Sequence, residues 1–213
     1  IHNGIQVIPS INVSTFEEVK ERVAKVEPYV KWCHLDITDG VFSKHATWHD
    51  PRDLINFRSS QDLKLEAHLM VVEPEKVIEQ WFVESVKRII IHLEAAKDLD
   101  FIIKKCREAG IEIGIAINPD TSWDKLQPWC GKVDLFQILT VKPGPSGQKM
   151  DEGSFDKIAH LRQSCPAGKI EIDGGINPET ARKAGESGVN ILVAGGYIFN
   201  SADIQKAIRE LID

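Results

Sequence analysis

The 213-residue sequence predicts an α/β fold that closes into a single (β/α)8 barrel, and two observations carry this prediction. Short apolar runs rich in Val and Ile alternate eight times with longer polar stretches of helical spacing. These runs are continuously apolar, as in Ile113–Ile117, which is typical of parallel strands buried on both faces. An open doubly wound sheet and a closed barrel both fit the alternation, and the count of eight favours the barrel.

The expected strands follow one another along the whole chain, on average about 27 residues apart, close to the length of one strand–helix–strand unit. They are Gln6–Ser10, Lys31–Ile37, Lys64–Leu69, Arg88–His92, Glu112–Ile117, Val133–Val141, Lys169–Asp173 and Asn190–Ala194. The expected helices between them include Thr15–Val26, Glu75–Glu84, Leu99–Ala109, Pro178–Ser187 and Ala202–Leu211.

Local signals support several of these helices. Ser14 or Thr15 stands before two glutamates, which is an N-terminal capping pattern. Pro178 follows Asn177, as a first-turn proline behind an N-cap does. Glycines that can end a helix follow the last turns of two of them, at Gly110 and Gly188. The fifth unit is the weakest, because Ser122–Trp129 gives at most a short helix.

Composition is that of an ordinary globular protein, with 42% hydrophobic residues and no linker or low-complexity segment, so we expect one domain over residues 1–213. Lys plus Arg number 26 and Asp plus Glu number 32, and the net charge of −6 argues against nucleic acid or an anionic membrane as partner. No apolar run has the roughly 20 residues of a membrane span, and residues 1–4 show no secretory signal. Four scattered cysteines without a CxxC pair favour free thiols in a reducing cytoplasm.

Polar residues gather where the expected strands end. They are Ser10, His34 and Asp36, His68, His92, Asn118, Thr140, Asp173 and the pair Gly195-Gly196. In a TIM barrel the active site is built at this carboxyl-terminal rim from several strands. A purely structural origin predicts polar residues at both strand ends without preference for type, and it does not explain His and Asp gathering at one rim.

Strand alternation places chemically related side chains on one face. In His34-Leu35-Asp36 the imidazole and the carboxylate share a face. The same holds for two further sets, Glu66 with His68 and Met70, and Glu171 with Asp173. A lone buried histidine is more often a hydrogen-bonded core residue. Two histidines and two aspartates converging at one rim instead suit a divalent metal such as Zn, Fe, Mn or Co.

Paired glycines follow the last two expected strands, at Gly174-Gly175 and Gly195-Gly196. Such pairs often make only tight turns. Phosphate sites in these barrels, however, are frequently built from the same two loops, because bare backbone N–H groups can approach an anion. We therefore expect a phosphate group here, and the segment Lys142–Gln148 is a lid or a third phosphate contact.

Five motifs in register resemble the ribulose-phosphate 3-epimerase family. They are His34–Gly40, His68–Met70, Thr140–Gln148, Ile172–Ile176 and Val193–Gly196. Pro9-Ser10 and His92-Leu93-Glu94 look similar too, so the resemblance spans about Ile8 to Phe199. It implies a metal-dependent isomerase of the pentose phosphate pathway. This enzyme would interconvert D-ribulose 5-phosphate and D-xylulose 5-phosphate by inversion at C3.

The resemblance also implies roles for individual residues. His34, Asp36, His68 and Asp173 would hold one divalent metal ion, and the two aspartates would be the acid/base pair. Ser10 and His68 would contact a small ketose phosphate. The remaining contacts to substrate would come from the backbone of Gly144, Pro145, Ser146, Gly147, Gly174, Gly175, Gly195 and Gly196. Relatives are commonly oligomeric, so we expect a homo-oligomer.

The chemistry explains these requirements. Removing a proton beside a ketone requires stabilising an enediolate, and inversion requires a base on one face and an acid on the other. We expect the two aspartates to titrate as a coupled pair. Glu66 and Glu171 either orient the metal-binding imidazoles or form charge pairs within the barrel core.

The sequence departs from the family pattern at several positions. Thr38 and Leu139 stand where the family tends to have Met. If these side chains cover the enediolate, Thr38 would make the cavity more polar. In the segment after the sixth strand, Pro145 replaces a usual Phe and Ser146 a usual Gly, so loop closure or substrate length would differ. The altered stretch Lys44–His49 adds two imidazoles near the mouth, as solvated loop residues or as polar contacts.

Three alternatives stay open at this point. The same chemistry could act on a six-carbon substrate such as allulose 6-phosphate. The orotidine-decarboxylase-like branch uses an Asp-x-Lys-x-x-Asp pattern, and Asp36-Ile37-Thr38-Asp39 has no Lys. A degenerate barrel could serve as a binding module, although all four expected metal ligands are present.

Overall fold

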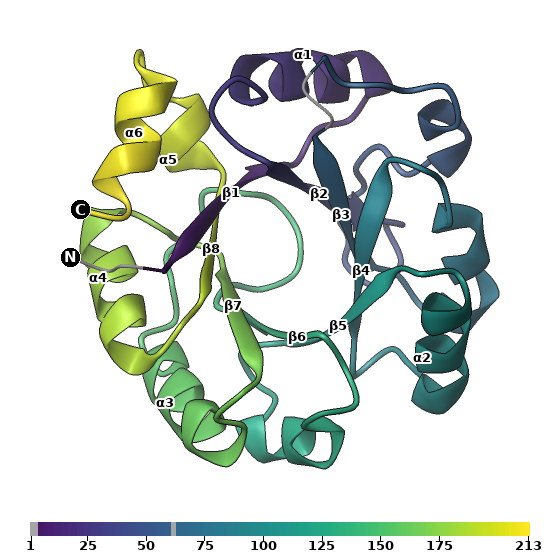
Figure 1. Cartoon of the computed structure of the whole chain (residues 1–213), viewed down its shortest axis with the longest axis vertical. Helices are drawn as coiled ribbons and strands as arrows, with labels where there is room; N and C mark the ends of the chain where they lie inside the picture. Colours follow the sequence, from purple (N-terminus) through teal and green to yellow (C-terminus); the bar gives the residue numbers. More distant parts are fainter. Residues whose placement is uncertain (1–3, 61–62) are drawn as a thin grey trace.

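The computed structural model describes residues 4–60 and 63–213, and its eight strands close into one parallel barrel, as predicted from the sequence (Figure 1). The strands are β1 (Gln6–Ile11), β2 (Trp32–Thr38), β3 (Lys64–Met70), β4 (Val86–His92), β5 (Glu112–Ile117), β6 (Leu135–Leu139), β7 (Lys169–Asp173) and β8 (Ile191–Ala194). Each strand pairs with the next, and β8 pairs with β1 to close the ring. Residues 1–3, part of the segment in which we expect no secretory signal, lie outside the described residues.

Helices lie around the outside of the ring (Figure 1). The α-helices are α1 (Phe16–Val26), α2 (Leu99–Glu108), α3 (Ser154–Ser164), α4 (Pro178–Ser187), α5 (Gly196–Phe199) and α6 (Ile204–Glu210). Short 3-10 helices occupy other connections: η1 (Pro51–Leu54), η2 (Pro74–Lys76), η3 (Ile78–Trp81) and η4 (Trp123–Trp129). None of the helices in the described part of the chain is both long enough and apolar enough to cross a membrane.

Capping residues set the ends of the helices where the sequence predicted them. Thr15 accepts a hydrogen bond from the backbone N–H of Glu18, whose side chain accepts one in return from the backbone N–H of Thr15. Asn177 caps α4 in the same way, and Gly188 ends that helix in the left-handed conformation at φ 103°. Helix α4 therefore has the bounds that its local signals predict.

The predicted helix Glu75–Glu84 is wrong. This connection contains the two 3-10 turns η2 and η3 instead, separated at Val77, whose φ of −122° and ψ of −15° interrupt a helix. Glu73, just before it, has φ 48°, in the left-handed region. Pro74, Ile78 and Trp81 are buried, so packing against the barrel fixes this segment more strongly than helical propensity does.

The expectation of four free thiols is right for Cys33 and Cys106, which are buried and unpaired among the described residues. It is wrong for Cys130 and Cys165, which form a disulfide. Their Cα atoms lie 5.7 Å apart because the end of η4 meets the end of α3. The two residues are 35 positions apart in the sequence, so only the fold brings them together.

Two apolar layers sandwich the strands. The larger one lies between the strands and the helices and includes Leu35, Leu65, Ile89, Ile113 and Ile172. The smaller one fills part of the barrel interior with Ile8, Ile90, Ala116, Leu135, Ile191 and Val193. The rest of the interior is polar: His34, Glu66, Glu171 and Gln137 are fully buried. A charged interior needs partners, and these partners lead directly to the site.

Candidate active site

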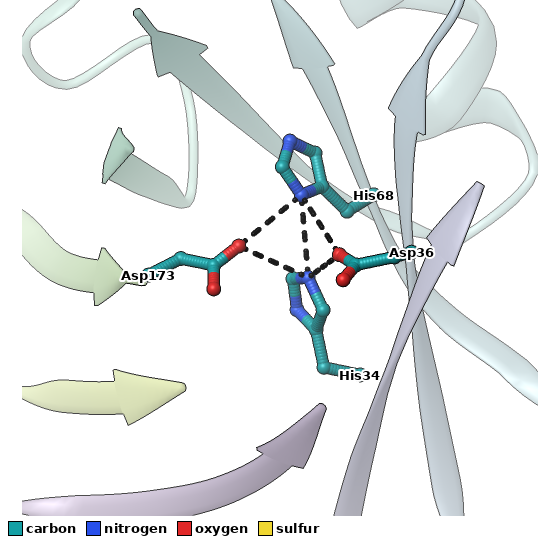
Figure 2. A group of neighbouring side chains, drawn as sticks. All are labelled: His34, Asp36, His68 and Asp173. Atoms are coloured by element: carbon teal, nitrogen blue, oxygen red, sulfur yellow. Dashed lines mark hydrogen bonds and ion pairs between the residues drawn. The ribbon is translucent and has the colours of Figure 1, made fainter. Parts of the chain in front are cut away.

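Strand register brings the four predicted metal ligands together at the carboxyl-terminal rim. β2 and β3 pair so that His34 lies opposite Glu66 and Asp36 opposite His68. Asp173 is the last residue of β7 and lies across the barrel from them (Figure 2). One ligand atom from each of the four side chains lies within 4.8 Å of every other. The alternation seen in the sequence thus gives one compact His2Asp2 cluster.

Figure 2 shows the close approaches within this cluster. His34 Nε2 lies 3.1 Å from Asp36 Oδ1, 3.3 Å from His68 Nδ1 and 3.5 Å from Asp173 Oδ2. His68 Nδ1 lies 3.5 Å from the same Asp36 oxygen and 3.4 Å from the same Asp173 oxygen. For metal–ligand bonds of about 2.0–2.1 Å, the edges of a tetrahedron are about 3.3 Å long. The donor atoms therefore have the spacing of a four-ligand metal site.

In both imidazoles, the ring nitrogen that points away from the cluster makes a hydrogen bond to another side chain. His34 Nδ1 donates to Glu66 Oε1 over 2.7 Å, so the lone pair of Nε2 faces the cluster. His68 Nε2 donates to His92 Nε2 over 2.8 Å, and His92 Nδ1 donates in turn to Glu94, 3.3 Å away. Two nitrogen lone pairs and two carboxylate oxygens consequently converge with no donor among them. Such a set requires a proton or a cation at its centre.

The pKa shifts indicate the same requirement. Burial lowers the pKa of His34, but hydrogen bonds to Asp36 and Glu66 outweigh it and raise the pKa well above its usual value. Burial raises the pKa of Asp36, but the contacts with His34 and His68 in their protonated, positively charged form outweigh it and hold that pKa well below its usual range. Each group is stabilised by positive charge at the centre, which a divalent metal provides directly.

Beneath the cluster, a buried network supports His34. Glu66 binds His34 with one oxygen and Arg88 with the other, at 2.7 Å each. Arg88 also reaches Glu112 at 2.6 Å, and its guanidinium lies over the Trp32 ring, 4.2 Å from the centroid. Both roles expected for Glu66 are therefore present, because it orients an imidazole and is part of a buried ion pair.

Glu171 behaves differently from Glu66. Its Oε1 accepts a hydrogen bond from Gln137 at 2.9 Å, while its Oε2 has no partner within the part of the chain that the structure describes. Burial and the nearby Glu66 charge raise its pKa well above the usual value. Glu171 thus makes no hydrogen bond to His34 or His68 and belongs to the polar interior of the barrel.

The histidine pair on β3 and β4 has its own anchor. Burial lowers the pKa of His92 to about 4, so this imidazole is neutral and can both accept and donate. Glu94, which accepts from His92, also accepts from the backbone N–H of Asn118 and from Thr121 Oγ1. Burial raises the pKa of Glu94, but these hydrogen bonds lower it to about 2. The sequence placed His92 at the rim and did not assign it this contact with His68.

A cavity of about 920 Å³ opens above the cluster. Every residue predicted for substrate binding, apart from His68, lines it: Ser10, Gly144, Pro145, Ser146, Gly147, Gly174, Gly175, Gly195 and Gly196. Asp36 and Asp173 line it too, whereas both imidazoles are fully buried below its floor. The cavity is also lined by residues that sequence reasoning missed, among them Lys149, Lys183, Tyr197 and Asn200. They lie on the loop after β6, on α4, on α5 and directly after α5, without a motif to mark them.

The two glycine pairs have different structural reasons. A Cβ on Gly174 would lie 2.8 Å from Thr140 Oγ1, and one on Gly175 would lie 2.7 Å from the backbone N of Met150. Both have positive φ, so turn geometry and close packing explain this pair. A Cβ on Gly195 or Gly196 would meet nothing closer than 3.4 Å, and neither has positive φ. Packing does not require glycine there, which favours ligand approach.

The departures from the family pattern have specific places. Thr38 is buried, with its hydroxyl 3.5 Å from that of Thr47, and it is not among the residues lining the cavity, whereas Met70 and Leu139 are. Ser146 does not have positive φ, so it carries no left-handed strain. His45 makes a polar contact with Asn12, at 3.1 Å. Thr38 therefore does not make the cavity wall more polar.

Comparison with known proteins shows which family this sequence matches. The sequence profile of the "Ribulose-phosphate 3 epimerase family" matches residues 6–199. The chain is 34% identical to the ribulose-phosphate 3-epimerase of Bacillus subtilis, covering 97% of this chain and 98% of that protein. It is 32% identical to the enzyme of the same name from Chlamydia muridarum, covering 98% and 94%. The chloroplastic ribulose-5-phosphate-3-epimerase of Arabidopsis thaliana is 33% identical, covering 97% and 76%.

Solved structures similar to this one include a 3-hexulose-6-phosphate synthase, with a TM-score of 0.75 and 16% identity over 97% of this chain and 98% of that one. KGPDC from Streptococcus mutans has a TM-score of 0.74 and 13% identity over 97% and 95%. At these identities the likeness concerns the barrel fold alone.

Proposed function

Because this chain belongs to the ribulose-phosphate 3-epimerase family, we propose that it interconverts D-ribulose 5-phosphate and D-xylulose 5-phosphate by inverting C3. The observation that carries the proposal is the position of two carboxylates from opposite sides of the barrel. Asp36 of β2 and Asp173 of β7 face the same two imidazoles and line the same cavity. A ketose carbon held between them would have one carboxylate on each face.

In the proposed reaction, one carboxylate removes the C3 proton, and the electrons of the broken C–H bond move toward the C2 carbonyl to give an enediolate. The other aspartate, in its protonated form, then delivers a proton to the opposite face of C3, and the C2 carbonyl re-forms. One proton leaves and one arrives, so no oxidant or reductant is needed. Asp36 and Asp173 exchange these roles in the reverse direction.

His34, Asp36, His68 and Asp173 would hold the divalent metal ion, and Zn, Fe, Mn and Co all suit this donor set. When bound, the metal would supply positive charge that stabilises the developing enediolate oxygens. Glu66 and His92 hold the two imidazoles in the orientation that metal binding needs. Our proposal includes no other cofactor.

The phosphate group of the substrate would bind at the wall formed by Gly195 and Gly196, where backbone N–H groups can approach it. Binding there would orient the reacting carbons above the two aspartates. The homo-oligomer and the cytoplasmic location expected from the sequence, and the absence of a nucleic-acid partner, stay predictions.

The test is incubation of D-ribulose 5-phosphate with the protein in D2O. We expect xylulose 5-phosphate labelled with deuterium at C3. We expect losses of about 10³-fold or more in both Asp36→Asn and Asp173→Asn, because each removes an acid/base group. Asp156→Asn, an exposed aspartate of α3, is the matched control and retains activity. Product without solvent deuterium would contradict the two-base mechanism.

Two further measurements separate the alternatives. Faster turnover of allulose 6-phosphate than of ribulose 5-phosphate would identify a six-carbon substrate. A purified chain with under about 0.2 equivalents of metal, inactive after addition of Fe, Mn, Co or Zn, would indicate a binding module that has lost catalysis.

A further inference from the structure

Asn12, which follows directly after β1, uses every hydrogen-bonding group of its side chain. Its Nδ2 donates to Asp36 Oδ2 over 3.0 Å and to the backbone carbonyl of Gly144 over 3.2 Å. Its Oδ1 lies 3.1 Å from His45 Nε2, which donates to it. A reversed amide would place Oδ1 against two acceptors, so the surroundings fix its orientation. One side chain thus joins three loops above the barrel.

The two oxygens of Asp36 have separate surroundings. Oδ1 faces the metal-binding imidazoles, 3.1 Å from His34 and 3.5 Å from His68. Oδ2 accepts hydrogen bonds from Asn12 and, over 3.2 Å, from Ser10 Oγ. Asp173 has no counterpart of Asn12 among the described residues, and its ion-pair contacts run from Oδ2 to His34 and His68. Asp36 thus has a neighbouring amide, and Asp173 has none in the part of the chain that the structure describes.

Gly144 connects this contact to the loop that covers the cavity. It lies in the segment between β6 and α3 and lines the cavity together with Pro145 and Ser146. A Cβ built on Gly144 would lie 3.6 Å from the Cβ of His45, so the loop lies close to the base of that side chain. The same amide that holds the Asp36 carboxylate also holds this part of the loop.

We propose that Asn12, oriented by His45, is a positioning residue that fixes the proton-transferring oxygen of Asp36 relative to the loop over the substrate. This inference rests on the proposed function, in which Asp36 and Asp173 transfer protons on opposite faces of C3. It assigns a role to two residues outside the predicted metal and substrate sites. It also predicts that damage to this contact slows one of the two proton transfers and leaves the other unchanged.

This selectivity can be measured. The equilibrium constant fixes the ratio of kcat/KM in the two directions, so rates alone do not identify the disturbed carboxylate. Isotope labelling does. When Asp173 removes the C3 proton and delivery from Asp36 is slow, the enediolate returns to substrate more often. Unreacted substrate recovered from D2O then gains deuterium, but only in the direction in which Asp173 acts first.

The experiment compares wild type with Asn12→Leu, which keeps side-chain size and removes both N–H donors. We expect kcat to fall about 10- to 100-fold, as small displacements of reacting groups do, with KM changed less than about threefold. We expect deuterium in recovered substrate to rise severalfold starting from the ketose phosphate whose C3 proton Asp173 removes, and to stay at or fall below the wild-type level starting from the other. An equal change in both directions, or wild-type rates and labelling, would overturn the inference.

His45 provides an independent test if Asn12→Leu fails to fold. His45→Phe removes the donor that orients Asn12 and should give the same one-sided labelling at smaller amplitude, whereas His45→Gln keeps an N–H and should restore the wild-type pattern. His49→Gln on the same loop, where His49 Nδ1 contacts the Thr47 carbonyl and no other polar atom of the described residues, is the control and should match wild type. Loss of C3 exchange in the wild type would instead reject the proposed function itself, together with this inference.

Discussion

At the carboxyl ends of β1 to β4 the site is built from polar side chains that hold one another through buried hydrogen bonds, whereas at the ends of β6 to β8 the cavity wall includes two glycine pairs and the loop after β6. The first half contributes Ser10, His34, Asp36 and His68, each held by a second polar group. The second half contributes the two glycine pairs, the loop after β6 and lysines such as Lys149 and Lys183, with Asp173 as its one member of the His2Asp2 cluster among the described residues.

This difference matches what each half would bind in the proposed reaction. A metal ion and a proton in transfer require specific atoms at fixed distances, so the first half places each side chain through buried hydrogen bonds. A phosphate group accepts hydrogen bonds from many directions, so bare backbone N–H groups suffice in the second half. Substitutions should therefore act through polar contacts in the first half and through steric fit or backbone shape in the second.

The largest expected effect is steric and lies in the second half. Gly175→Ala places a Cβ 2.7 Å from the backbone N of Met150 at a φ of 65°, and we expect a loss of about 2–4 kcal/mol in unfolding free energy. Gly195→Ala is the matched control for stability, because the atom nearest to its Cβ would be Ser10 O, at an ordinary contact distance of 3.4 Å. We expect it to change stability by less than about 1 kcal/mol and to raise KM instead. Urea unfolding and steady-state kinetics measure both, and equal destabilisation by the two variants would contradict this interpretation.

The two glycine pairs also show what the sequence can and cannot reveal. The place of the four glycines after β7 and β8 predicts a phosphate site at both pairs. The sequence does not show that a turn requires glycine at the first pair and that no neighbouring atom does so at the second. Similarly, Pro178–Ser187 was predicted with its correct bounds because Asn177, Pro178 and Gly188 are local signals. The prediction of a helix at Glu75–Glu84 is wrong because the burial of Ile78 and Trp81 determines the conformation of this segment, and burial is a tertiary effect that local signals do not show.

The metal cluster was predictable because strand alternation alone places His34 with Asp36 and Glu66 with His68 on shared faces. The contacts of Asn12 with Asp36 and of His92 with His68 were not, since they depend on which loops and strands become neighbours. The disulfide between Cys130 and Cys165 was missed for the same reason. Periodicity along one strand is local information, while pairing between strands and loops is set by closure of the barrel.

The second prediction tests the hydrogen bond between Glu66 and His34 in the first half of the barrel. Glu66→Gln replaces the carboxylate that accepts from His34 and pairs with Arg88 by a neutral amide. We expect divalent metal affinity to fall about 10- to 100-fold, as for other carboxylates that support metal-binding histidines.

Glu171→Gln is the matched control on β7. It makes no hydrogen bond to either imidazole among the described residues, and we expect less than about a threefold change. Competition with a chromogenic chelator for Zn or Co measures both, and equal losses would show that interior polarity in general, and not the contact with His34, sets the affinity.

The third prediction concerns the anchor of His92. Glu94 has a pKa of about 2 in the folded protein against an ordinary 4.5, because the hydrogen bonds from His92, Thr121 and Asn118 outweigh its burial. A lowered carboxyl pKa stabilises the fold fully above about pH 4.5, and this stabilisation is lost as pH falls toward about 2. Glu94→Gln should therefore lower the unfolding free energy by on the order of 2 kcal/mol at pH 7, with the gap to wild type narrowing by about half near pH 3.

Glu186→Gln, which breaks an exposed pair with Arg182 on α4, should have no measurable effect at either pH. Urea unfolding at both pH values tests this, and a gap that stays constant with pH would mean that Glu94 acts through its shape rather than its charge.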